Sequence, residues 1–469
     1  MTDAADVAII GAGVVGTAIA RELSRYQLSV TLLDAGNDIG TGTTKANTAI
    51  LHTGFDAVPG SLESRLLQRG YSLLTDYAAQ ADIAVERLGA LLIAWTPEQQ
   101  RALPGIVDKA EQNGYTAIRP VSSDALYRRE PHLQPGALAA LEIPDESIIC
   151  PWTTPLAYAT EAVRAGVRLR LNTAVTAISQ APEGWRALAT TRGEVLCRWL
   201  VNAAGLNSDR IDGMAVSAGS DGGGFTITPR RGELIVFDKL ARSLVSSILL
   251  PVPTSQTKGV LIAPTVYGNV LLGPTAQDIS DREDTATTAN GLANLLAAGR
   301  SILPALLNEE VTATYAGLRA AAEHRDYQIR VDGPRRYACA GGIRSTGLSA
   351  SLGIAEYVVD LLGEAGLPLV RRTGSDPGPP RMPYLGQAGI RPYQHQAKIA
   401  ADSAYGQIVC HCERVTAGEI RDALTSTIPP TDSDGLRRRT RALNGRCQGF
   451  YCGARVARLA AIGTGGPTS

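Results

Sequence analysis

The glycine-rich stretch "GAGVVG" near the start of the chain constrains the fold more than any other feature. Gly11, Gly13 and Gly16 form a G-x-G-x-x-G pattern between the apolar run 7–10 and a helical pattern of apolar residues. In a strand–turn–helix unit these glycines permit a tight turn, close approach to a pyrophosphate and close helix–strand packing. The helix N-terminus adds a positive pole for the phosphates. The stretch therefore predicts a dinucleotide site.

The residues that follow complete the unit. The apolar run 28–33 predicts a second strand, and Asp34 stands at its end, eighteen residues beyond Gly16. A carboxylate there accepts hydrogen bonds from ribose hydroxyls and repels a 2′-phosphate. The spacing does not separate NAD from FAD. This is the only G-x-G-x-x-G in the chain, whereas a flavin reductase fed by NADH would normally carry a second nucleotide fold, so the pattern favours tightly held FAD.

The last sixty residues hold four of the seven cysteines, as Cys410-x-Cys412 and Cys447-x4-Cys452, with thirty-four residues between the pairs. A [2Fe–2S] cluster takes four such ligands, two for each iron. Structural zinc also takes four cysteines, but its paired ligands are usually two to four residues apart. Free thiols or disulfides would fit the count as well. The remaining cysteines are expected to be small buried hydrophobic residues: Cys150, Cys197 and Cys339.

Arginines 437–439 and 441 lie between the two cysteine pairs. They form either a solvated helix face or a set of cations that compensates the negative charge of a four-thiolate cluster. The sequence alone leaves both interpretations open. His411, between two of the cysteines, is expected to tune the cluster rather than to catalyse.

Size and charge limit the function classes. A chain of 469 residues predicts two or three domains. Lys+Arg and Asp+Glu both total 45, and zero net charge argues against a general nucleic-acid binder. The sequence contains no run of eighteen apolar residues, which a membrane-spanning helix would need. The N-terminus lacks the layout of a signal peptide. We expect a cytoplasmic protein, with attachment to the inner face of a membrane left open.

The pattern of elements predicts an α/β fold with three parts. A Rossmann-like FAD-binding part is expected at about 1–80, 145–215 and 325–365, interleaved with a mostly antiparallel β substrate part at about 81–144 and 216–324. The oxidoreductase region as a whole would span 1–372. A Pro/Gly-rich linker at 373–403 and a small helical module at 404–469, which would bind the [2Fe–2S] cluster, complete the chain.

Several stretches resemble known families. "DVAIIGAGVVGTAIARELSRY", "TTKANTAILHTGFDA", "PRRGELIVFDK" and "YAGLRA" resemble the D-amino-acid-oxidase-like flavoprotein superfamily, in the branch of glycerol-3-phosphate and L-2-hydroxyglutarate dehydrogenases. The segment of about 404–462, with "GQIVCHCE" and "RCQGFYC", resembles the bacterioferritin-associated-ferredoxin-like [2Fe–2S] domain. That domain is found at the C-terminus of the large subunit of anaerobic-type glycerol-3-phosphate dehydrogenase.

The resemblance implies which residues bind FAD. These residues belong to four places. They are a loop near the FAD pyrophosphate and flavin ring, a residue beside the adenine, a stretch where the backbone passes close to the cofactor, and a helix start at the pyrimidine end of the flavin. The residues are Thr43, Thr44, Lys45, Asn47, Val175, Ala203, Ala204, Gly205, Gly342, Thr346, Gly347, Leu348 and Ser349. The chain departs from related ones in this last region: it has "GGIRSTGL", where an arginine replaces an acid and a threonine replaces a proline.

Catalysis needs a base for the hydroxyl proton and cations for an anionic substrate. His52 in "ILHTGFD" is either this base or a residue that packs against and positions FAD; His324 is the second candidate, more in keeping with a surface role. Arg319 in "YAGLRA" matches a position that commonly faces the substrate in the superfamily. Weaker candidates for anion binding are Arg231, Lys258 and Arg344.

The expected activity is oxidation of a small anionic secondary alcohol by hydride transfer to flavin N5. Glycerol 3-phosphate is the first choice and L-2-hydroxyglutarate or another 2-hydroxy acid the next. An amino-acid or opine dehydrogenase also fits the pattern, and so does a non-enzymatic iron–sulfur flavoprotein that only transfers electrons. The cluster would pass electrons to an external acceptor, either a quinone through a partner subunit or a carrier protein. The sequence leaves open whether the protein forms a homo-oligomer or a hetero-oligomer.

Overall fold

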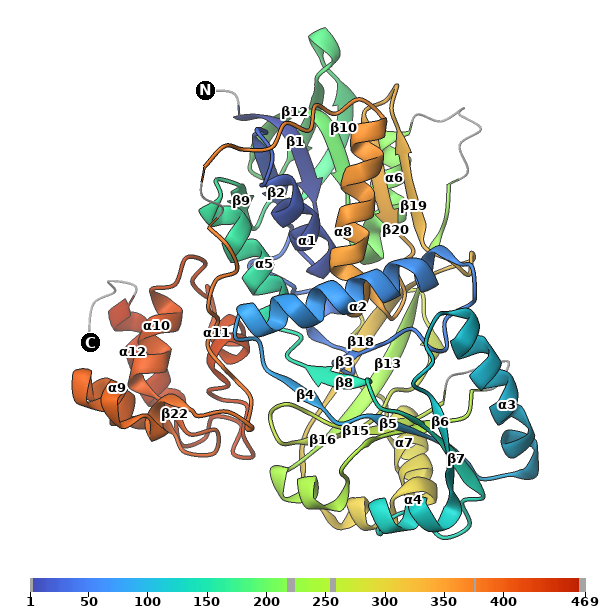
Figure 1. The fold of residues 1–469 in the computed structure, drawn as a ribbon. Helices are drawn as coiled ribbons and strands as arrows, with labels where there is room; N and C mark the ends of the chain where they lie inside the picture. Colours follow the sequence, from blue (N-terminus) through green and yellow to red (C-terminus); the bar gives the residue numbers. More distant parts are fainter. Residues whose placement is uncertain (1–2, 217–223, 254–258, 375–376, 464–469) are drawn as a thin grey trace.

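The computed structural model describes residues 3–216, 224–253, 259–374 and 377–463. One sheet with its helices occupies the upper part of the molecule in Figure 1, a second sheet the lower part, and a helical C-terminal module lies beside them. The predicted Lys258 falls outside the described residues.

The first sheet is built around β1 (Asp3–Ile10), which pairs in parallel with β2 (Val30–Leu33) and β12 (Gly193–Asn202). Val7, Ala8 and Ile9 have no exposed surface, because helices cover both faces of the sheet. The other strands of this sheet are β9 (Arg168–Arg170), β10 (Val175–Gln180), β11 (Arg186–Thr190), β19 (Gln328–Asp332) and β20 (Tyr337–Gly341).

Helices pack on this sheet. α1 (Val14–Leu23) lies between α5 (Thr153–Arg164) and α8 (Gly347–Glu364), and α6 (Ser208–Ala215) packs against β20. The order β1–α1–β2 is the one that the sequence predicts. The fold class is therefore confirmed for this part of the chain.

α2 (Leu62–Gln80) runs between the two sheets and crosses α8 (Figure 1). The two helices cross closely because each has a glycine that faces the backbone of the other helix. A Cβ at Gly70 would lie 2.5 Å from the carbonyl oxygen of Ser349, and a Cβ at Gly353 would lie 2.5 Å from that of Leu66. No side chain fits at either position without moving a helix.

The second sheet is dominated by the long antiparallel pair β13 (Ile227–Phe237) and β18 (Val311–Ala322). Among its strands only β14 and β5 pair in parallel, so the expectation of a mostly antiparallel sheet is confirmed. The others are β5 (Ala90–Ala94), β6 (Arg119–Ser122), β7 (Ala139–Ile143), β14 (Ile248–Pro251), β15 (Leu261–Pro264), β16 (Val270–Gly273) and β17 (Gln277–Asp278). Its helices are α3 (Pro97–Gln112), α4 (Ser123–Arg129) and α7 (Ala289–Ile302).

A three-stranded sheet joins these two parts. β8 (Ser147–Ile149) pairs with β3 (Ile50–Leu51) on one side and with β4 (Val85–Arg87) on the other. Leu51 lies directly opposite Ser147. The residues just after β3 and just before β8 are therefore neighbours in space.

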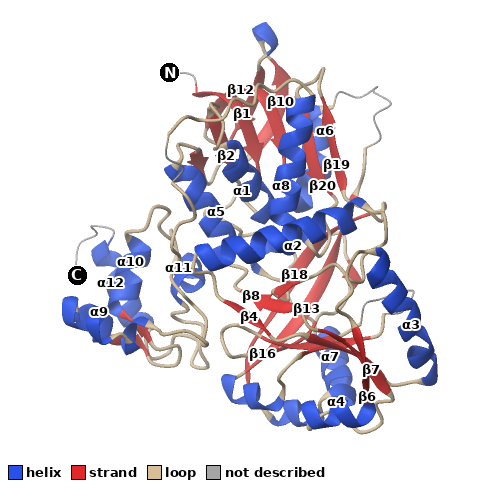
Figure 2. Ribbon diagram, in the orientation of Figure 1, coloured by secondary structure: helices blue, strands red, loops and turns tan. Residues whose placement is uncertain are grey.

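The C-terminal module is mostly helical, as Figure 2 shows. A small core of Val409, Val415, Ile420, Leu436 and Val456 holds it together. Its elements are α9 (Gln396–Ala401), β21 (Ile408–Cys410), β22 (Val415–Thr416), α10 (Ala417–Leu424), α11 (Ser433–Thr440) and α12 (Gly453–Gly463).

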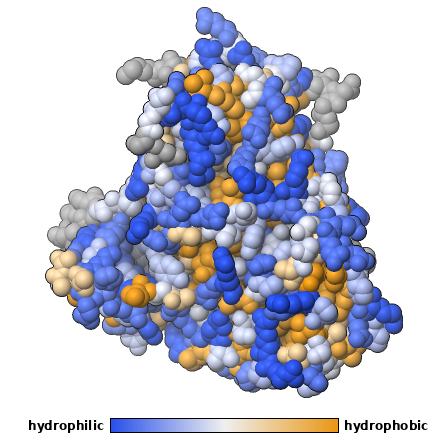
Figure 3. All heavy atoms as spheres, viewed as in Figure 1, coloured by the Kyte–Doolittle hydropathy of each residue, from blue (hydrophilic) through white to orange (hydrophobic). Residues whose placement is uncertain are grey.

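The surface drawn in Figure 3 is mostly hydrophilic. Hydrophilic residues cover most of the face in Figure 3, interrupted by apolar patches in the upper part and again in the lower part. Among the described residues, no helix combines the length and the apolar character needed to cross a bilayer.

Candidate active site and iron–sulfur module

The glycine turn after β1 forms a cradle of backbone. Gly11 has a φ of +107°, and a Cβ there would lie 2.3 Å from the carbonyl oxygen of Ala203. Gly13 is the N-cap of α1 and supplies no capping side chain, while the Val14 amide donates to Thr44 Oγ1 at 3.1 Å. The first amides of a helix are the usual binding site of a pyrophosphate. The cradle therefore fits a dinucleotide.

Asp34 lies at the end of β2, beside this cradle. Its Oδ2 accepts a hydrogen bond from the Ala12 amide at 2.5 Å, and its Oδ1 accepts one from the Gly36 amide at 2.6 Å. Burial raises the pKa of the Asp34 carboxyl above its ordinary value and outweighs these two hydrogen bonds. The carboxylate is thus held by backbone at the position where a ribose would bind.

The predicted cofactor loop 43–47 lies against β18. Thr43 Oγ1 donates to the carbonyl of Leu318 at 2.7 Å, and the Tyr315 hydroxyl donates to the carbonyl of Asn47 at 2.7 Å. Lys45 is exposed in this loop. The loop therefore connects the glycine cradle to the strand that carries Arg319.

The start of α8 approaches the same region. Thr346 is the N-cap but makes no side-chain cap, since its hydroxyl donates to Glu63 Oε1 at 2.6 Å instead. Gly342 follows β20, and Gly347, Leu348 and Ser349 form the first turn. The uncapped amides of this turn favour negative charge, as an anionic reduced flavin would supply. Three other predicted positions lie on the first sheet or just after it: Val175 begins β10, and Ala204 and Gly205 follow β12.

His52 is tied to this helix start and to a buried acid. Its backbone amide donates to Ser349 Oγ at 2.9 Å, and its Nδ1 lies 3.0 Å from Glu146 Oε2. The Glu146 side chain has no exposed surface, and its Oε1 accepts from both the amide and the hydroxyl of Thr53. This acceptor-only carboxylate favours the tautomer in which Nδ1 carries the proton and Nε2 the lone pair.

Arg319 lies close to the loop 43–47, because its neighbour Leu318 binds Thr43. Its Nη2 donates to the carbonyl of Thr275 at 2.6 Å, and it lies opposite Arg230 across the β13–β18 pair. Burial and the nearby charge of Arg230 lower the pKa of Arg319 to about 10, so the group stays a cation at neutral pH. A partly buried cation of this kind can hold an anion.

Two other predicted cations are engaged elsewhere. Arg231 is buried and donates to Asp284 Oδ2 at 2.8 Å and to Gln277 Oε1 at 2.7 Å. Arg344 donates to the carbonyl of Ala322 at 2.8 Å and to that of His324. A substrate at either arginine would have to displace these contacts or share the guanidinium with them.

The second histidine candidate is exposed. The His324 side chain is 53% exposed and has Glu323 as its neighbour at 3.9 Å. His411 is exposed on the turn between Cys410 and Cys412.

The four C-terminal cysteines come together as two pairs. The thiols of Cys410 and Cys452 share a hydrogen bond, and so do those of Cys412 and Cys447. Burial raises the pKa of Cys410, whereas the Tyr451 amide lowers that of Cys447. Within the described residues, no three His, Cys, Asp or Glu side chains converge on one point as a closed metal site would require. Two pairs, one per iron, still match the donor set of a [2Fe–2S] cluster, and backbone amides aimed at sulfur stabilise its charge.

The arginines between the cysteine pairs do not form a solvated face. Arg439 and Arg441 are buried, and Arg438 has a side chain only 11% exposed. Arg438 and Arg439 both bind Asp38, which lies just after β2, and Arg441 binds Glu413 beside Cys412. Arg437 alone matches the surface interpretation, with its side chain 34% exposed and paired to Asp434. Most of this run therefore joins the C-terminal module to the body.

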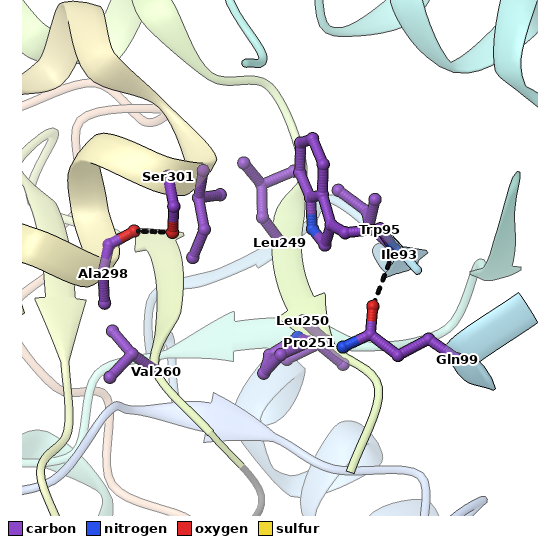
Figure 4. Close-up of a pocket in the computed structure, with 10 residues that line it drawn as sticks. Ile93, Trp95, Gln99, Leu249, Leu250, Pro251, Val260, Ala298 and Ser301 are labelled. Atoms are coloured by element: carbon purple, nitrogen blue, oxygen red, sulfur yellow. Dashed lines mark hydrogen bonds between the residues drawn. The ribbon is translucent and has the colours of Figure 1, made fainter. Parts of the chain in front are cut away.

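A separate pocket of about 370 Å³ lies in the second sheet, away from these residues (Figure 4). Leu249, Pro251 and Val260 give it an apolar lining, and Gln99 on α3 accepts from the Trp95 amide at its edge. None of the predicted site residues lines it.

Comparison with known families agrees with the geometry. The family model "FAD dependent oxidoreductase" (DAO) matches residues 6–361, and the model "BFD-like [2Fe-2S] binding domain" matches residues 408–461. The first match covers more than half of the chain.

Relatives resemble the chain over most of its length. It is 34% identical over 459 residues to a glycerol 3-phosphate dehydrogenase of Caloramator mitchellensis, covering 97% of this chain and 94% of the relative. It is 30% identical over 366 residues to a glycerol 3-phosphate oxidase of Mycoplasma pneumoniae, covering 76% and 94%. The solved structure of dithionite-reduced L-alpha-glycerophosphate oxidase from Mycoplasma pneumoniae with FAD bound matches with a TM-score of 0.74 at 28% identity, covering 80% of this chain and 97% of that one.

The residues present fit both cofactors. The glycine cradle and the uncapped starts of α1 and α8 suit FAD, and the paired cysteines suit the cluster. The chain belongs to the family of FAD-dependent oxidoreductases of the DAO type and carries a C-terminal BFD-like [2Fe–2S] binding domain.

Proposed function

We propose that the protein oxidises glycerol 3-phosphate and passes the electrons through its [2Fe–2S] cluster to an external acceptor. One observation carries this proposal: the identity of 34% to a glycerol 3-phosphate dehydrogenase extends over both the flavoprotein part and the cysteine module. The L-2-hydroxyglutarate dehydrogenases, such as the human one at 29% identity, align over only 59% of this chain.

In this proposal His52 is the base. Bound FAD supplies the hydride acceptor. With Nδ1 held by Glu146, Nε2 of His52 takes the proton of the substrate hydroxyl, and the buried carboxylate stabilises the imidazolium that forms. The Thr53 amide and hydroxyl keep Glu146 in place while the charge develops.

Arg319 is the proposed partner of the phosphate. It is a partly buried cation on β18, which the loop 43–47 contacts through Thr43. The carbonyl of Thr275 occupies one of its donors, and a guanidinium has further N–H groups for an anion. Arg231, Arg344 and Lys258 stay weaker candidates for the same role.

The cysteine module supports a dehydrogenase rather than an oxidase. The oxidase relative aligns over 94% of its own length but over only 76% of this chain. An enzyme that hands electrons to oxygen needs no one-electron relay. A cluster accepts single electrons, so the acceptor would be a one-electron carrier protein or a quinone reached through a partner.

The test is an anaerobic titration of the purified holoprotein, followed through its visible spectrum. Glycerol 3-phosphate should bleach the flavin, whereas L-2-hydroxyglutarate and amino acids should not. Bleaching by a 2-hydroxy acid or an amino acid alone would replace the substrate but keep the redox architecture. A protein that no candidate bleaches, although dithionite does, would favour a flavoprotein that only transfers electrons.

A further inference from the structure

The cluster module and the body meet around one buried arginine. The Arg441 side chain is only 6% exposed, although it belongs to the C-terminal module. Its Nε lies 3.1 Å from Glu413 Oε2, inside its own module. Its Nη2 donates to Asn269 Oδ1 of the body at 3.3 Å. The guanidinium thus bridges the two parts.

The face of this guanidinium lies on an aromatic pair of the body. The Arg441 carbon Cζ is 4.1 Å from the ring centre of Tyr267 and 5.7 Å from that of Trp152. The two rings are stacked, with centres 5.0 Å apart and planes 18° from parallel. A cation over aromatic rings is held by the negative faces of the rings.

The aromatic pair contacts the predicted cofactor loop. Trp152 Nε1 donates to the carbonyl of Lys45 at 3.1 Å, and Lys45 belongs to the loop 43–47. The Tyr267 hydroxyl is buried and lies 3.0 Å from the sulfur of Cys150. The stack is therefore anchored at both rings to the body, and at Trp152 to the loop 43–47.

Arg441 is also connected to the cluster cysteines. Glu413, its partner, follows Cys412 in the chain and also accepts from Lys239 Nζ at 3.0 Å. The path from Lys45 through Trp152, Tyr267, Arg441 and Glu413 to Cys412 is thus continuous in contact.

Arg441 also adopts an uncommon backbone. It is the C-cap of α11 and has a φ of +74°, in the left-handed region that glycine or asparagine would adopt at lower cost. Strain of this kind persists where the surrounding structure fixes it, and it is concentrated at functional positions. Here the strain directs the guanidinium onto the aromatic pair.

We propose that Arg441 and the Trp152–Tyr267 stack form the electron-transfer contact between the flavin site and the [2Fe–2S] site. This rests on the proposed function. One electron at a time passes from reduced flavin to a ferric ion of the cluster, which becomes ferrous. An external one-electron acceptor reoxidises the cluster. Two such transfers return the flavin to its oxidised state, and the protons that the flavin releases go to solvent. Arg441 is a positioning residue: it holds the cluster loop on the stack, and its charge favours the more negative, reduced cluster.

The experiment uses the holoprotein and two ways of reducing its flavin. Glycerol 3-phosphate is mixed rapidly and anaerobically in one arm, and photochemical reduction of the flavin, which needs no substrate, is used in the other. Flavin bleaching is followed by absorbance and cluster reduction by freeze-quench electron paramagnetic resonance. A redox titration of the cluster gives its midpoint potential, and small-angle scattering reports whether the module stays docked.

The variants are Arg441→Ala, Arg441→Lys and Tyr267→Leu, with Arg437→Ala as a matched control that removes the same charge from the same helix. We expect flavin reduction to stay at the native rate in all of them. Transfer to the cluster should fall about tenfold or more in Arg441→Ala and Tyr267→Leu, because a shift of about 1 Å in a reacting geometry has effects of this size. Arg441→Lys should recover part of the rate, and the midpoint potential should fall in Arg441→Ala but not in Arg437→Ala.

Tyr267→Phe keeps the stack and removes only the hydroxyl, so it should transfer electrons at the native rate. If Arg441→Ala undocks the module, Tyr267→Leu decides, because its change lies on the body. Native transfer rates and an unchanged potential in docked Arg441→Ala and Tyr267→Leu would overturn the proposal. If glycerol 3-phosphate fails to bleach the flavin while photoreduction still shows the expected losses, the proposed substrate fails and this contact stands.

Discussion

Nδ1 of His52 lies 3.0 Å from Oε2 of Glu146, and the Glu146 side chain has no exposed surface. The two residues are ninety-four positions apart in the chain. They meet because β3 and β8 pair in antiparallel fashion, with one residue just after β3 and the other just before β8. A buried acid behind a histidine fixes which ring nitrogen carries the proton.

Glu146→Gln should slow the reductive half-reaction. An amide can hydrogen-bond Nδ1 in either sense and carries no charge, so the imidazolium would lose its stabilisation. We expect the rate of flavin bleaching to fall by about 10²-fold with little change in the apparent substrate affinity, the scale of a general-base contribution. Stopped-flow absorbance under anaerobic conditions measures it.

The matched control is Asp145→Asn. Asp145 is the neighbouring acid, and its carboxylate accepts from the Tyr115 hydroxyl at 3.0 Å on the exposed side. It should bleach at the native rate. Equal rates in both variants and the native protein would remove Glu146 from the reaction.

Arg319→Gln should weaken substrate binding. The loss of a charge-assisted hydrogen bond of about 1.5–3 kcal/mol predicts a rise of about ten- to a hundredfold in the apparent dissociation constant for glycerol 3-phosphate. Arg230→Gln is the control, because Arg230 lies directly opposite on β13 but pairs with Asp278 at the surface. A titration that gives both variants the native affinity would contradict the assignment.

Docking of the C-terminal module should depend on acid pH. The guanidinium groups of Arg439 and Arg438 hold the pKa of the Asp38 carboxyl below its ordinary 3.8, although burial alone would raise it. The stabilisation is therefore complete above about pH 4 and is lost as the pH falls below 3.8 through the lower pKa of the folded state. Thermal melting and scattering across this window should show the module loosening first.

Asp38→Asn should cost about 3–5 kcal/mol of stability at neutral pH, because it leaves buried arginines without a counter-charge. It should also flatten the acid dependence. Asp402→Asn removes an exposed carboxylate of the same module, which pairs with Arg421 at the surface, and should change the melting temperature little. A melting curve of Asp38→Asn like that of the native protein would show that the buried pair contributes nothing.

Gly70→Ala and Gly353→Ala should each destabilise the protein by about 1–3 kcal/mol, since a methyl group would overlap backbone of the neighbouring helix. Gly105→Ala, inside α3 with nothing within 4 Å of the new carbon, should instead stabilise it by about 0.5–1 kcal/mol. Denaturant unfolding monitored by circular dichroism distinguishes the two signs. A stabilising Gly70→Ala would mean that α2 and α8 can separate at no cost.

Cys412→Ser should abolish the iron–sulfur absorbance while FAD remains bound. A cluster with three thiolates and a hydroxyl is held less well, because the soft sulfur donors select iron–sulfur clusters. Iron and acid-labile sulfide should both fall to trace amounts. Cys339→Ala, a buried cysteine of β20, should retain both; retention of the native iron content in Cys412→Ser would remove this residue from the ligand set.

Local patterns predict much of the fold. The glycine turn between β1 and α1, the acid after β2 and the strand–turn–helix at β20 and α8 each depend on neighbouring residues, so periodicity and turn chemistry reveal them. The paired cysteines carry their own signature in their spacing. The mostly antiparallel second sheet follows from short apolar runs separated by turn residues.

The partners that complete the site could not be predicted in this way. Glu146 stands in "PDESII" and carries no motif; only the pairing of β3 with β8 brings it to His52. Asp38 and Arg439 are four hundred and one positions apart, and an isolated acid in a loop predicts nothing about a distant helix. Charged residues usually lie at the surface, so a run of arginines gives no sequence signal of burial.

Asp38 lies four residues after Asp34, in the segment that leaves the nucleotide cradle. The same short piece of backbone thus carries the candidate ribose-binding acid at its start and anchors the C-terminal module at its end. Whatever orders this segment favours both roles, and thermodynamic linkage makes the effect mutual. We therefore expect FAD binding and docking of the C-terminal module to stabilise each other.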